Sequence, residues 1–279
     1  MTRTTSRTTA LSVHLVLGFY TLLAVFPILL IIINSLKTKK AIFRDPTGLP
    51  VGDTFSLKGY LHVLKNGDFA LYFSNSMIVT TVSIGLIVLL GAMAGHAISE
   101  YKFRFNRLIF IYLILGIMVP IRLGTVALLD MMVALSLVNT LTGLILVYVA
   151  QGLPVAVFIF SEFLRGVSSE IKDSARMDGL NEYQIFFQVV VPLVRPVVAT
   201  VAVFSMIPIW NDLWFPLILA PGEETRTVTL GVQQFIGQYT VNWNAVLAAL
   251  TVAIMPVLTL YLIFSKQLIR GITAGAVKG

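Results

Sequence analysis

The sequence contains no cysteine, and its charged residues and histidines are few. Of its 279 residues, only 12% are Asp, Glu, Lys or Arg and three are histidines, whereas 57% are hydrophobic. The absence of cysteine excludes a disulfide framework, thiolate metal sites and a cysteine nucleophile. A chain this apolar and this poor in charge differs strongly from an ordinary soluble domain. The composition therefore predicts a membrane protein.

Catalytic motifs are missing as well. The histidines His14, His62 and His96 are scattered, and the sequence has neither an H-E-x-x-H nor a G-x-S-x-G motif. The phosphate-binding pattern G-x-x-x-x-G-K-[ST] is also absent. We therefore expect a chain that is not an enzyme, has no metal site and binds no cofactor itself.

The formal net charge of +7 raises the question of nucleic-acid binding. The Lys and Arg residues, however, lie in short clusters between long apolar runs and not along one helix face. Clusters of this kind are typical of anchors at the ends of membrane segments. The charge pattern therefore favours a membrane protein over a nucleic-acid-binding one.

Arg3 and Arg7 precede the first apolar run, 11–33, as basic residues precede the core of a secretory signal peptide. The core of a signal peptide spans roughly 7–15 residues and is followed by a cleavage site of small residues. This run is longer, and the residues after Ile33 do not fit that site. We expect the run to be retained as a first membrane span.

A helix needs about 20 mostly apolar residues to cross a bilayer. Six segments reach this length: 11–33, 77–98, 108–128, 138–160, 194–219 and 244–264. The sequence thus predicts an all-α, polytopic membrane protein with six transmembrane helices at 11–264, between short tails at 1–10 and 265–279. Six crossings place both termini on the same side.

The positively charged residues indicate the orientation, because cytoplasmic loops carry more Lys and Arg. Twelve fall on the side of the amino terminus: Arg3, Arg7, Lys102, Arg104, Arg107, Arg165, Lys172, Arg176, Arg195, Lys266, Arg270 and Lys278. Eight fall on the other side: Lys37, Lys39, Lys40, Arg44, Lys58, Lys65, Arg122 and Arg226. The excess favours a cytoplasmic amino terminus, although the cluster at 37–44, directly after the first span, points the other way.

Several spans contain residues that a simple anchor does not need. Gly91 and Gly95 form a small-xxx-small pattern, which lets two helix backbones approach closely in lipid. Prolines interrupt or flank other spans, at Pro120, Pro208, Pro216 and Pro256. Two interpretations fit these features: tight packing of a helix bundle, or helices that bend around a path for a solute.

The segment 165–192 differs in character from the spans. A polar stretch from Glu170 to Asp178 predicts a helix, Gly179 a turn, and the residues from Asn181 a second helix that Pro192 stops. Aromatic and apolar residues recur in the second helix at spacings of three to four, at Tyr183, Phe186, Phe187 and Val190. Such a hairpin either packs on its own bundle or docks on a partner protein.

This segment resembles the EAA loop of ABC importer permeases, in which E-A-A is followed by two residues, D-G and an aromatic-rich helix that ends in P-L and a further proline. The matching residues here are Asp173, Ser174, Ala175, Asp178, Gly179, Phe186, Pro192, Leu193 and Pro196. Asp replaces Glu and Ser replaces Ala in the triplet. These changes keep the hairpin but remove the longer Glu side chain.

The carboxyl terminus is similar to the ending G-x-T-x-G-A-V-K-G of maltose-type carbohydrate permeases. It is matched by Gly271, Thr273, Gly275, Ala276, Val277, Lys278 and Gly279. Further matches are the run from Pro120 to Leu129, Asn139 with Thr140, and Trp210, Asn211 and Asp212 with Pro216. The resemblance extends over nearly the whole chain after the first loop.

The resemblance implies a permease subunit of a sugar importer in the bacterial inner membrane, with both termini in the cytoplasm. Its expected partners are a second permease subunit, two ATPase subunits that bind ATP and Mg, and an extracytoplasmic sugar-binding protein. The hairpin is then expected to couple to the ATPases through Glu170, Asp173, Ser174, Ala175, Asp178, Gly179, Tyr183, Phe186 and Phe187. The tail residues expected to contact the ATPases are Ala274, Gly275, Ala276, Val277 and Lys278.

Two further groups of polar and aromatic residues are candidates for function. Trp210, Asn211 and Asp212 lie in the fifth predicted span, where a charge at the centre is costly. They either line the solute path or mark the outer interface, where Trp is common and Asp is solvated. In the outer loop 220–243, candidate contacts with the binding protein are Glu223, Glu224, Gln233 and Tyr239.

An ATP-independent channel or a receptor-like membrane protein is the alternative to an importer. Six helices are compatible with either class. Neither class accounts for the polar hairpin or for the small, flexible tail. The importer is therefore the preferred interpretation, with alternating access as its mechanism.

Overall fold

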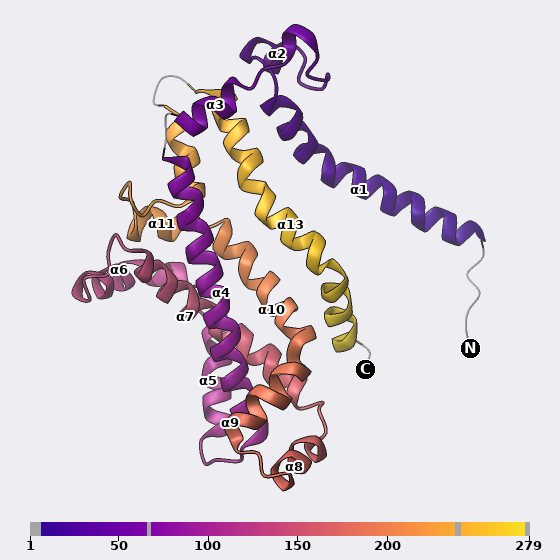
Figure 1. The fold of residues 1–279 in the computed structure, drawn as a ribbon, viewed down its shortest axis with the longest axis vertical. Coiled ribbons are helices and arrows are strands. Elements are labelled where there is room, and N and C mark those ends of the chain that lie inside the picture. Colours follow the sequence, from indigo (N-terminus) through magenta and orange to yellow (C-terminus); the bar gives the residue numbers. More distant parts are fainter. Residues whose placement is uncertain (1–6, 66–67, 238–240, 277–279) are drawn as a thin grey trace. The chain divides into compact units, whose positions relative to one another are not determined.

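The computed structural model describes the backbone of residues 7–65, 68–237 and 241–276, and the side chains of residues 11–263 within these ranges. Helices dominate the described chain (Figure 1). Among the described residues, the only strand-like pairings are two isolated bridges, Lys37 with Phe55 and Ile236 with Val241. The predicted all-α fold is confirmed.

Five helical segments within the described part of the chain are long and apolar enough to cross a membrane. They are Leu11–Ser35 in α1 (Arg7–Ser35), α4 (Phe69–Glu100), α7 (Leu141–Leu164), Glu182–Trp210, and Trp243–Ile263 in α13 (Trp243–Ala276). A sixth span exists only if the bent pair Asn106–Met118 and Ile121–Ala134 counts as one. The structure thus confirms a polytopic membrane protein.

The third predicted span, 108–128, is not one straight helix. α5 (Asn106–Met118) ends before Pro120, and the short helix η2 (Ile121–Gly124) leads into α6 (Thr125–Ala134), with a bend of 85° between the two parts. Proline has no N–H to donate, and it pushes the residue before it, here Val119, towards extended backbone. Val119 has this extended conformation.

The fifth predicted span, 194–219, is also broken, and the predicted stop at Pro192 is wrong. The helix runs on from α9 (Glu182–Ile185) through the π-helical turn η3 (Phe186–Val190) into α10 (Val191–Trp210). Pro192, which has no N–H to donate, lies just after the π-helical turn, where the helix already departs from regular α-helical bonding. A break after Trp210 then separates α10 from α11 (Trp214–Leu219).

The chain divides into two compact units. The first consists of Met1–Phe69 and Gly231–Ile254, and the second of Ala70–Leu230 and Met255–Gly279. Short helices in the first unit are α2 (Lys39–Arg44), η1 (Gly52–Thr54), α3 (Lys58–Lys65) and η4 (Gln233–Phe235), and α12 (Val228–Val232) lies at the boundary between the units.

Lys37 of the first unit is buried, so not every residue of the basic cluster at 37–44 is a surface charge. Its Nζ donates to the carbonyl oxygens of Asp45 at 2.7 Å and Pro46 at 3.3 Å. Its own carbonyl oxygen accepts a hydrogen bond from Asn244 at 2.6 Å. Lys37 therefore stabilises the loop after α1 and does not act as a free surface anchor, whereas Lys39 and Lys40 are exposed.

Close packing of α4 against α7 forms much of the core of the second unit. A Cβ atom added at Gly91 would lie 2.7 Å from the Cβ of Ala156, and one at Gly95 would lie 2.7 Å from the Cβ of Phe160. Only glycine permits this approach, so the predicted small-xxx-small contact is confirmed. Around it lie the fully buried side chains of Ile87, Leu144, Phe160, Ile185 and Val190.

Leucine at Gly91 or Gly95 should destabilise the bundle, because the added side chain meets α7. Overpacking typically costs about 1–3 kcal/mol, which should appear as a lower melting temperature of the protein in detergent. Gly85 of the same helix is the control, since a Cβ there meets nothing within 4 Å. Equal melting temperatures for all three leucine variants would contradict the packing described here.

Candidate functional site

The hairpin between α7 and α10 is a capped helix, a turn and a second capped helix. The side chain of Ser168 accepts a hydrogen bond from the backbone N–H of Glu170 at the start of α8 (Ser169–Met177). Gly179 then turns the chain with a φ of +87°, a conformation that costs glycine little. Asn181 and Gln184 cap α9 reciprocally, each side chain bonding the other residue's N–H at 2.9 Å. The predicted helix-turn-helix is confirmed.

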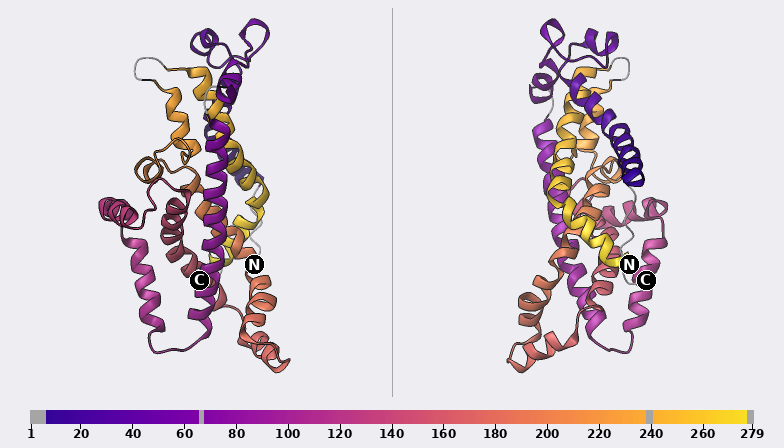
Figure 2. Two further views of the ribbon diagram at one scale, coloured as in Figure 1. Left: turned by 60° about the vertical axis from the view of Figure 1, so that its left-hand side comes forward. Right: turned by 90° about the vertical axis from the view of Figure 1, so that its right-hand side faces the viewer.

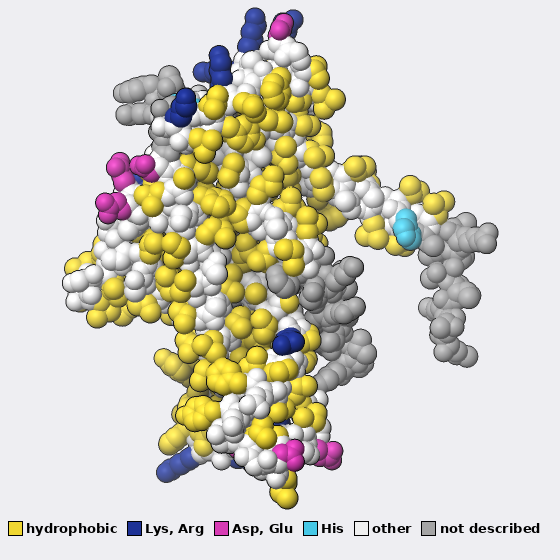
Figure 3. Space-filling view, viewed as in Figure 1, with side chains coloured by type: hydrophobic (Ala, Val, Ile, Leu, Met, Phe, Trp, Pro, Cys, Tyr) yellow, Lys and Arg dark blue, Asp and Glu magenta, His cyan; other side chains and the backbone are white. Residues whose placement is uncertain are grey.

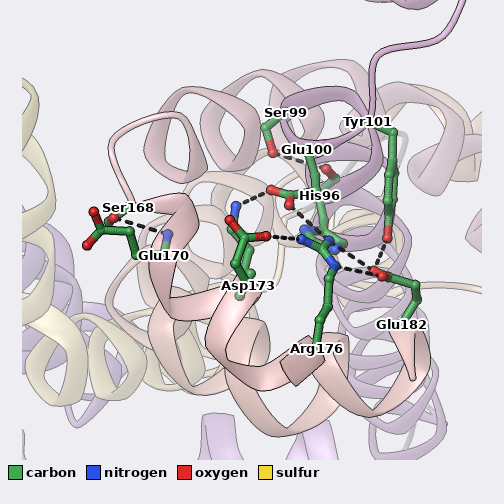
Figure 4. Close-up of polar contacts among 10 residues, drawn as sticks. His96, Ser99, Glu100, Tyr101, Ser168, Glu170, Asp173, Arg176 and Glu182 are labelled. Carbon is green, nitrogen blue, oxygen red and sulfur yellow. Dashed lines mark hydrogen bonds and ion pairs between the residues drawn. The ribbon is translucent and has the colours of Figure 1, made fainter. Parts of the chain in front are cut away.

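Ion pairs and hydrogen bonds join this hairpin to the end of α4 (Figure 4). The Lys172 ammonium bonds the Glu100 carboxylate, and the Arg176 guanidinium reaches Glu100 at 3.0 Å. Arg176 also bonds Asp173 at 2.7 Å and Glu182 at 2.9 Å. We call this group the hairpin cluster; its members are Glu100, Tyr101, Lys172, Asp173, Arg176 and Glu182.

Burial makes part of the hairpin cluster energetically important. The side chains of Lys172 and Glu100 are 4% and 10% exposed, so each charge depends on its protein partners. Removing one partner of a buried ion pair costs about 3–5 kcal/mol, because the other charge is left uncompensated. The pair therefore holds α8 firmly to the last residue of α4.

Tyr101, the residue that follows α4, also belongs to the hairpin cluster. Burial and the hydrogen bond to Glu182 raise the pKa of Tyr101 to about 12, so its hydroxyl stays protonated and donates to the carboxylate. The hydrogen bonds with Glu182 and Glu100 raise the pKa of Arg176. Both arms of the hairpin thus bond to consecutive residues at the end of α4.

The apolar residues of the second arm do not form one surface. Phe186 and Val190 are buried in the bundle, whereas the side chains of Tyr183 and Phe187 are 77% and 55% exposed. Phe186 packs against His96 of α4 and against Phe187, with ring centroids 5.7 Å and 5.0 Å apart. A single apolar face, as the spacing predicts, is therefore wrong. The buried residues show that the second arm packs partly on its own bundle, and docking on a partner protein stays a prediction.

The residues expected to couple to ATPases divide in the same way. Ala175 and Phe186 are buried within this chain. The exposed ones are Glu170, Asp173, Ser174, Asp178, Gly179, Tyr183 and Phe187. The acidic side chains of the hairpin are visible on the surface in Figure 3, whereas the helices next to it expose mainly hydrophobic side chains. The hairpin thus exposes charged side chains at this end of the second unit.

A second polar group lies at the break between α10 and α11. The buried carboxylate of Asp212 accepts hydrogen bonds from the backbone N–H groups of Trp214 at 3.2 Å and Phe215 at 3.1 Å, and from the Tyr148 hydroxyl at 3.0 Å. Arg122 lies 3.6 Å away, with 67% of its side chain exposed against 7% for Asp212. The Asp212 carboxylate therefore takes the place of helical carbonyl oxygens as the acceptor for N–H groups at the start of α11.

Of the three candidate path residues, only Asn211 is exposed. Trp210 is buried with its ring edge towards Phe73, at a centroid distance of 5.7 Å. Two further exposed residues, Arg122 and Trp214, lie beside Asp212. The Arg122 guanidinium lies over the ring of Trp214 at 5.9 Å, and the indole N–H of Trp214 donates to Thr125 at 3.0 Å. The bend after α5 and the break after α10 thus meet.

The loop that contains Glu223 and Glu224 is held in place by two asparagines. The Asn75 amide of α4 donates to the carbonyl oxygens of Glu224 at 2.8 Å and Arg226 at 3.0 Å. Asn139, which has a φ of +60°, accepts from the Gly222 N–H at 2.8 Å. Both acidic side chains remain exposed on a loop whose backbone is fixed.

The remaining predicted contacts, in the outer loop and the carboxyl-terminal tail, lie apart from the hairpin cluster in the sequence or outside the described residues. Gln233 is exposed and belongs to the first unit, and Tyr239 lies outside the described residues. The backbone of Ala274, Gly275 and Ala276 continues α13. Val277 and Lys278 lie outside the described residues.

Comparison with known proteins identifies the family. Residues 87–274 match the family described as "Binding-protein-dependent transport system inner membrane component". The diacetylchitobiose uptake system permease protein NgcG of Streptomyces coelicolor is 30% identical, over 94% of this chain and 87% of the relative. The arabinooligosaccharides transport system permease protein AraQ of Halalkalibacterium halodurans is also 30% identical, over 94% of each chain.

A solved structure has the same fold. A chain of a bacterial ABC transporter involved in the import of the acidic polysaccharide alginate superposes with a TM-score of 0.80, covering 95% of this chain and 98% of that one, at 22% identity. The family match covers more than half of the chain, and it includes the hairpin and the break at Asp212. The chain therefore belongs to the family of inner-membrane components of binding-protein-dependent transport systems.

Proposed function

We propose that this chain is a permease subunit of an ATP-driven, binding-protein-dependent carbohydrate importer. Membership of the family and the names of the sugar-transporting relatives support the substrate class. The observation that carries the role of the chain is the hairpin, a pair of capped helices at the end of α4 (Figure 2). Its Tyr183 and Phe187 side chains are exposed. A partner protein would bury these side chains.

The surface of the hairpin fits a protein partner with a basic cleft. Tyr183 and Phe187 provide exposed aromatic anchors, the residue type that contributes most to binding energy at interfaces. Glu170 and Asp178 of the same hairpin are also exposed and add negative charge to its surface. We assign this surface to an ATPase subunit, which would bind ATP and Mg, since the phosphate-binding loop is absent from this sequence.

The same assignment gives the orientation in a bacterial inner membrane. If the hairpin meets an ATPase, it lies in the cytoplasm together with both termini. Lys37, one of the eight basic residues that count against this orientation, is buried on carbonyl oxygens and so is no surface anchor. The exposed acidic residues Glu223 and Glu224 would then face the binding protein on the outer side.

Transport would proceed by alternating access within a complex of two permease and two ATPase subunits. ATP binding would close the ATPases and displace the hairpins, and the helices would reorient in response. The bend at Val119 and Pro120 and the break at Asn211 to Leu213 are two points where a helix departs from regular geometry. We propose that Asn211, Arg122 and Trp214, which are exposed there, contact the solute, while Asp212 maintains the backbone.

Replacing Tyr183 and Phe187 by serine should release the ATPase without unfolding the chain. Both side chains are exposed, so their loss removes docking area but little core. The measurement is co-purification of the ATPase subunit with the tagged chain, together with the melting temperature. Leu64→Ser, at an exposed apolar residue of α3, is the control. If the chain purifies without an ATPase even unaltered, a channel or receptor function replaces the importer.

Valine at Gly179 should reduce the coupling of ATP hydrolysis to uptake. The turn has a φ of +87°, and a Cβ there meets nothing within 4 Å, so only the backbone resists the change. The left-handed conformation costs roughly 1–2 kcal/mol for an ordinary residue and less for asparagine. We expect more ATP hydrolysed per sugar imported in proteoliposomes for Gly179→Val than for Gly179→Asn. Normal coupling in the valine variant would contradict a fixed turn.

Alanine at Asp212 should lower the melting temperature, whereas alanine at Asn211 should not. Removing the Asp212 carboxylate leaves the Tyr148 hydroxyl and two backbone N–H groups without their partner, at about 1–3 kcal/mol for each buried group. Asn211→Ala should instead reduce sugar uptake by the folded complex. Unchanged uptake in that variant would remove Asn211 from the solute path.

A further inference from the structure

We propose that α4 mechanically links the hairpin to the loop that carries Glu223 and Glu224, with Glu100 and Asn75 as the positioning residues at its two ends. The inference rests on the proposed function, in which the hairpin meets an ATPase and the loop meets the binding protein. The new element is that one continuous helix, α4, transmits movement between the hairpin and the loop.

The contacts at the carboxyl end of α4 join it to both arms of the hairpin. Glu100, the last residue of α4, bonds Lys172 and Arg176 of α8. The next residue, Tyr101, bonds Glu182 of α9. On α8 the only buried residues are Lys172 and Ala175, so the ion pair with Glu100 is the main attachment of that arm to the bundle. A displacement of α8 is therefore transmitted to Glu100.

The contacts near the amino end of α4 fix the backbone of the outer loop. Asn75 donates to the carbonyl oxygens of Glu224 and Arg226, and the Ser76 hydroxyl accepts from the N–H of Val228 at 2.8 Å. Asn75 and Ser76 are both buried, and the bond of Ser76 to Val228 is buried as well. The loop backbone consequently follows this part of α4.

The helix between these two ends is suited to transmit a displacement. α4 has 32 residues, which corresponds to about 48 Å at 1.5 Å per residue. It contains no proline, and Gly91 and Gly95 keep it in close contact with α7. Tightly packed elements respond to displacement as bodies and do not deform continuously. Movement of the hairpin should therefore reach the loop, and binding at the loop should reach the hairpin.

The test measures ATP hydrolysis by the complete complex in proteoliposomes, with and without the sugar-loaded binding protein. For the Glu100→Gln and Asn75→Ala complexes, the quantity compared is the ratio of hydrolysis with the binding protein to hydrolysis without it. The increase on adding the binding protein should fall on the order of tenfold, the usual range of an allosteric coupling. Glu162→Gln is the matched control, because Glu162 forms an exposed ion pair with Arg165 on α7. It should leave the increase unchanged.

Charge reversal distinguishes an ion pair from a merely structural role. Glu100→Lys alone places three positive charges together and should abolish the response or the assembly. The double variant Glu100→Lys with Lys172→Glu keeps one acid and two bases in the same place. It should restore assembly, measured by co-purification of the ATPase, and the response to the binding protein.

The outcomes separate the two levels of the proposal. An unaltered complex that shows no ATP hydrolysis, or none that responds to a binding protein, contradicts the proposed function itself. An unaltered complex that responds, together with Glu100→Gln and Asn75→Ala variants that respond equally, overturns the role of α4 alone. So does a charge-reversed double variant that behaves like Glu100→Lys.

Discussion

Hydrocarbon offers no hydrogen bonds, so each backbone N–H and C=O group in a membrane protein must find its partner within the protein. Helices meet this requirement by themselves, whereas irregular segments need turn hydrogen bonds or side chains to meet it. In this chain Asp212 accepts the N–H groups at the start of α11, and Lys37 donates to two carbonyl groups after α1. This requirement explains the positions of these two polar residues, Asp212 and Lys37.

The same requirement couples structure to function. A broken helix exposes polar groups only where other polar groups already stabilise the break, so Arg122 and Trp214 lie beside the buried Asp212. At the other end of the second unit, the Glu100 carboxylate satisfies Lys172 and also fixes the hairpin. Residues needed to maintain the backbone thus determine where exposed groups can meet a solute or a partner.

The features that local patterns encode could be predicted from the sequence. The lengths of the apolar segments, the contact at Gly91 and Gly95, and the turn at Gly179 depend on neighbouring residues alone. The pairing of Glu100 with Lys172 could not, because 72 residues separate them and no periodicity relates them. The course of the helix past Pro192 depended on a π-helical turn, which has no simple sequence signal.

The π-helical turn at Phe186–Val190 has one further consequence. Its i to i+5 bonding fits an additional residue into one turn, and in an α-helix each residue advances the direction of the side chains by about 100°. The additional residue therefore sets the angle between the side chains of α9 and those of α10. Phe186 and Val190, at the two ends of this turn, are buried, whereas Tyr183 before it is exposed. Related chains that differ by a single insertion here could present identical aromatic residues in different directions, so partner choice can depend on chain length where composition is the same.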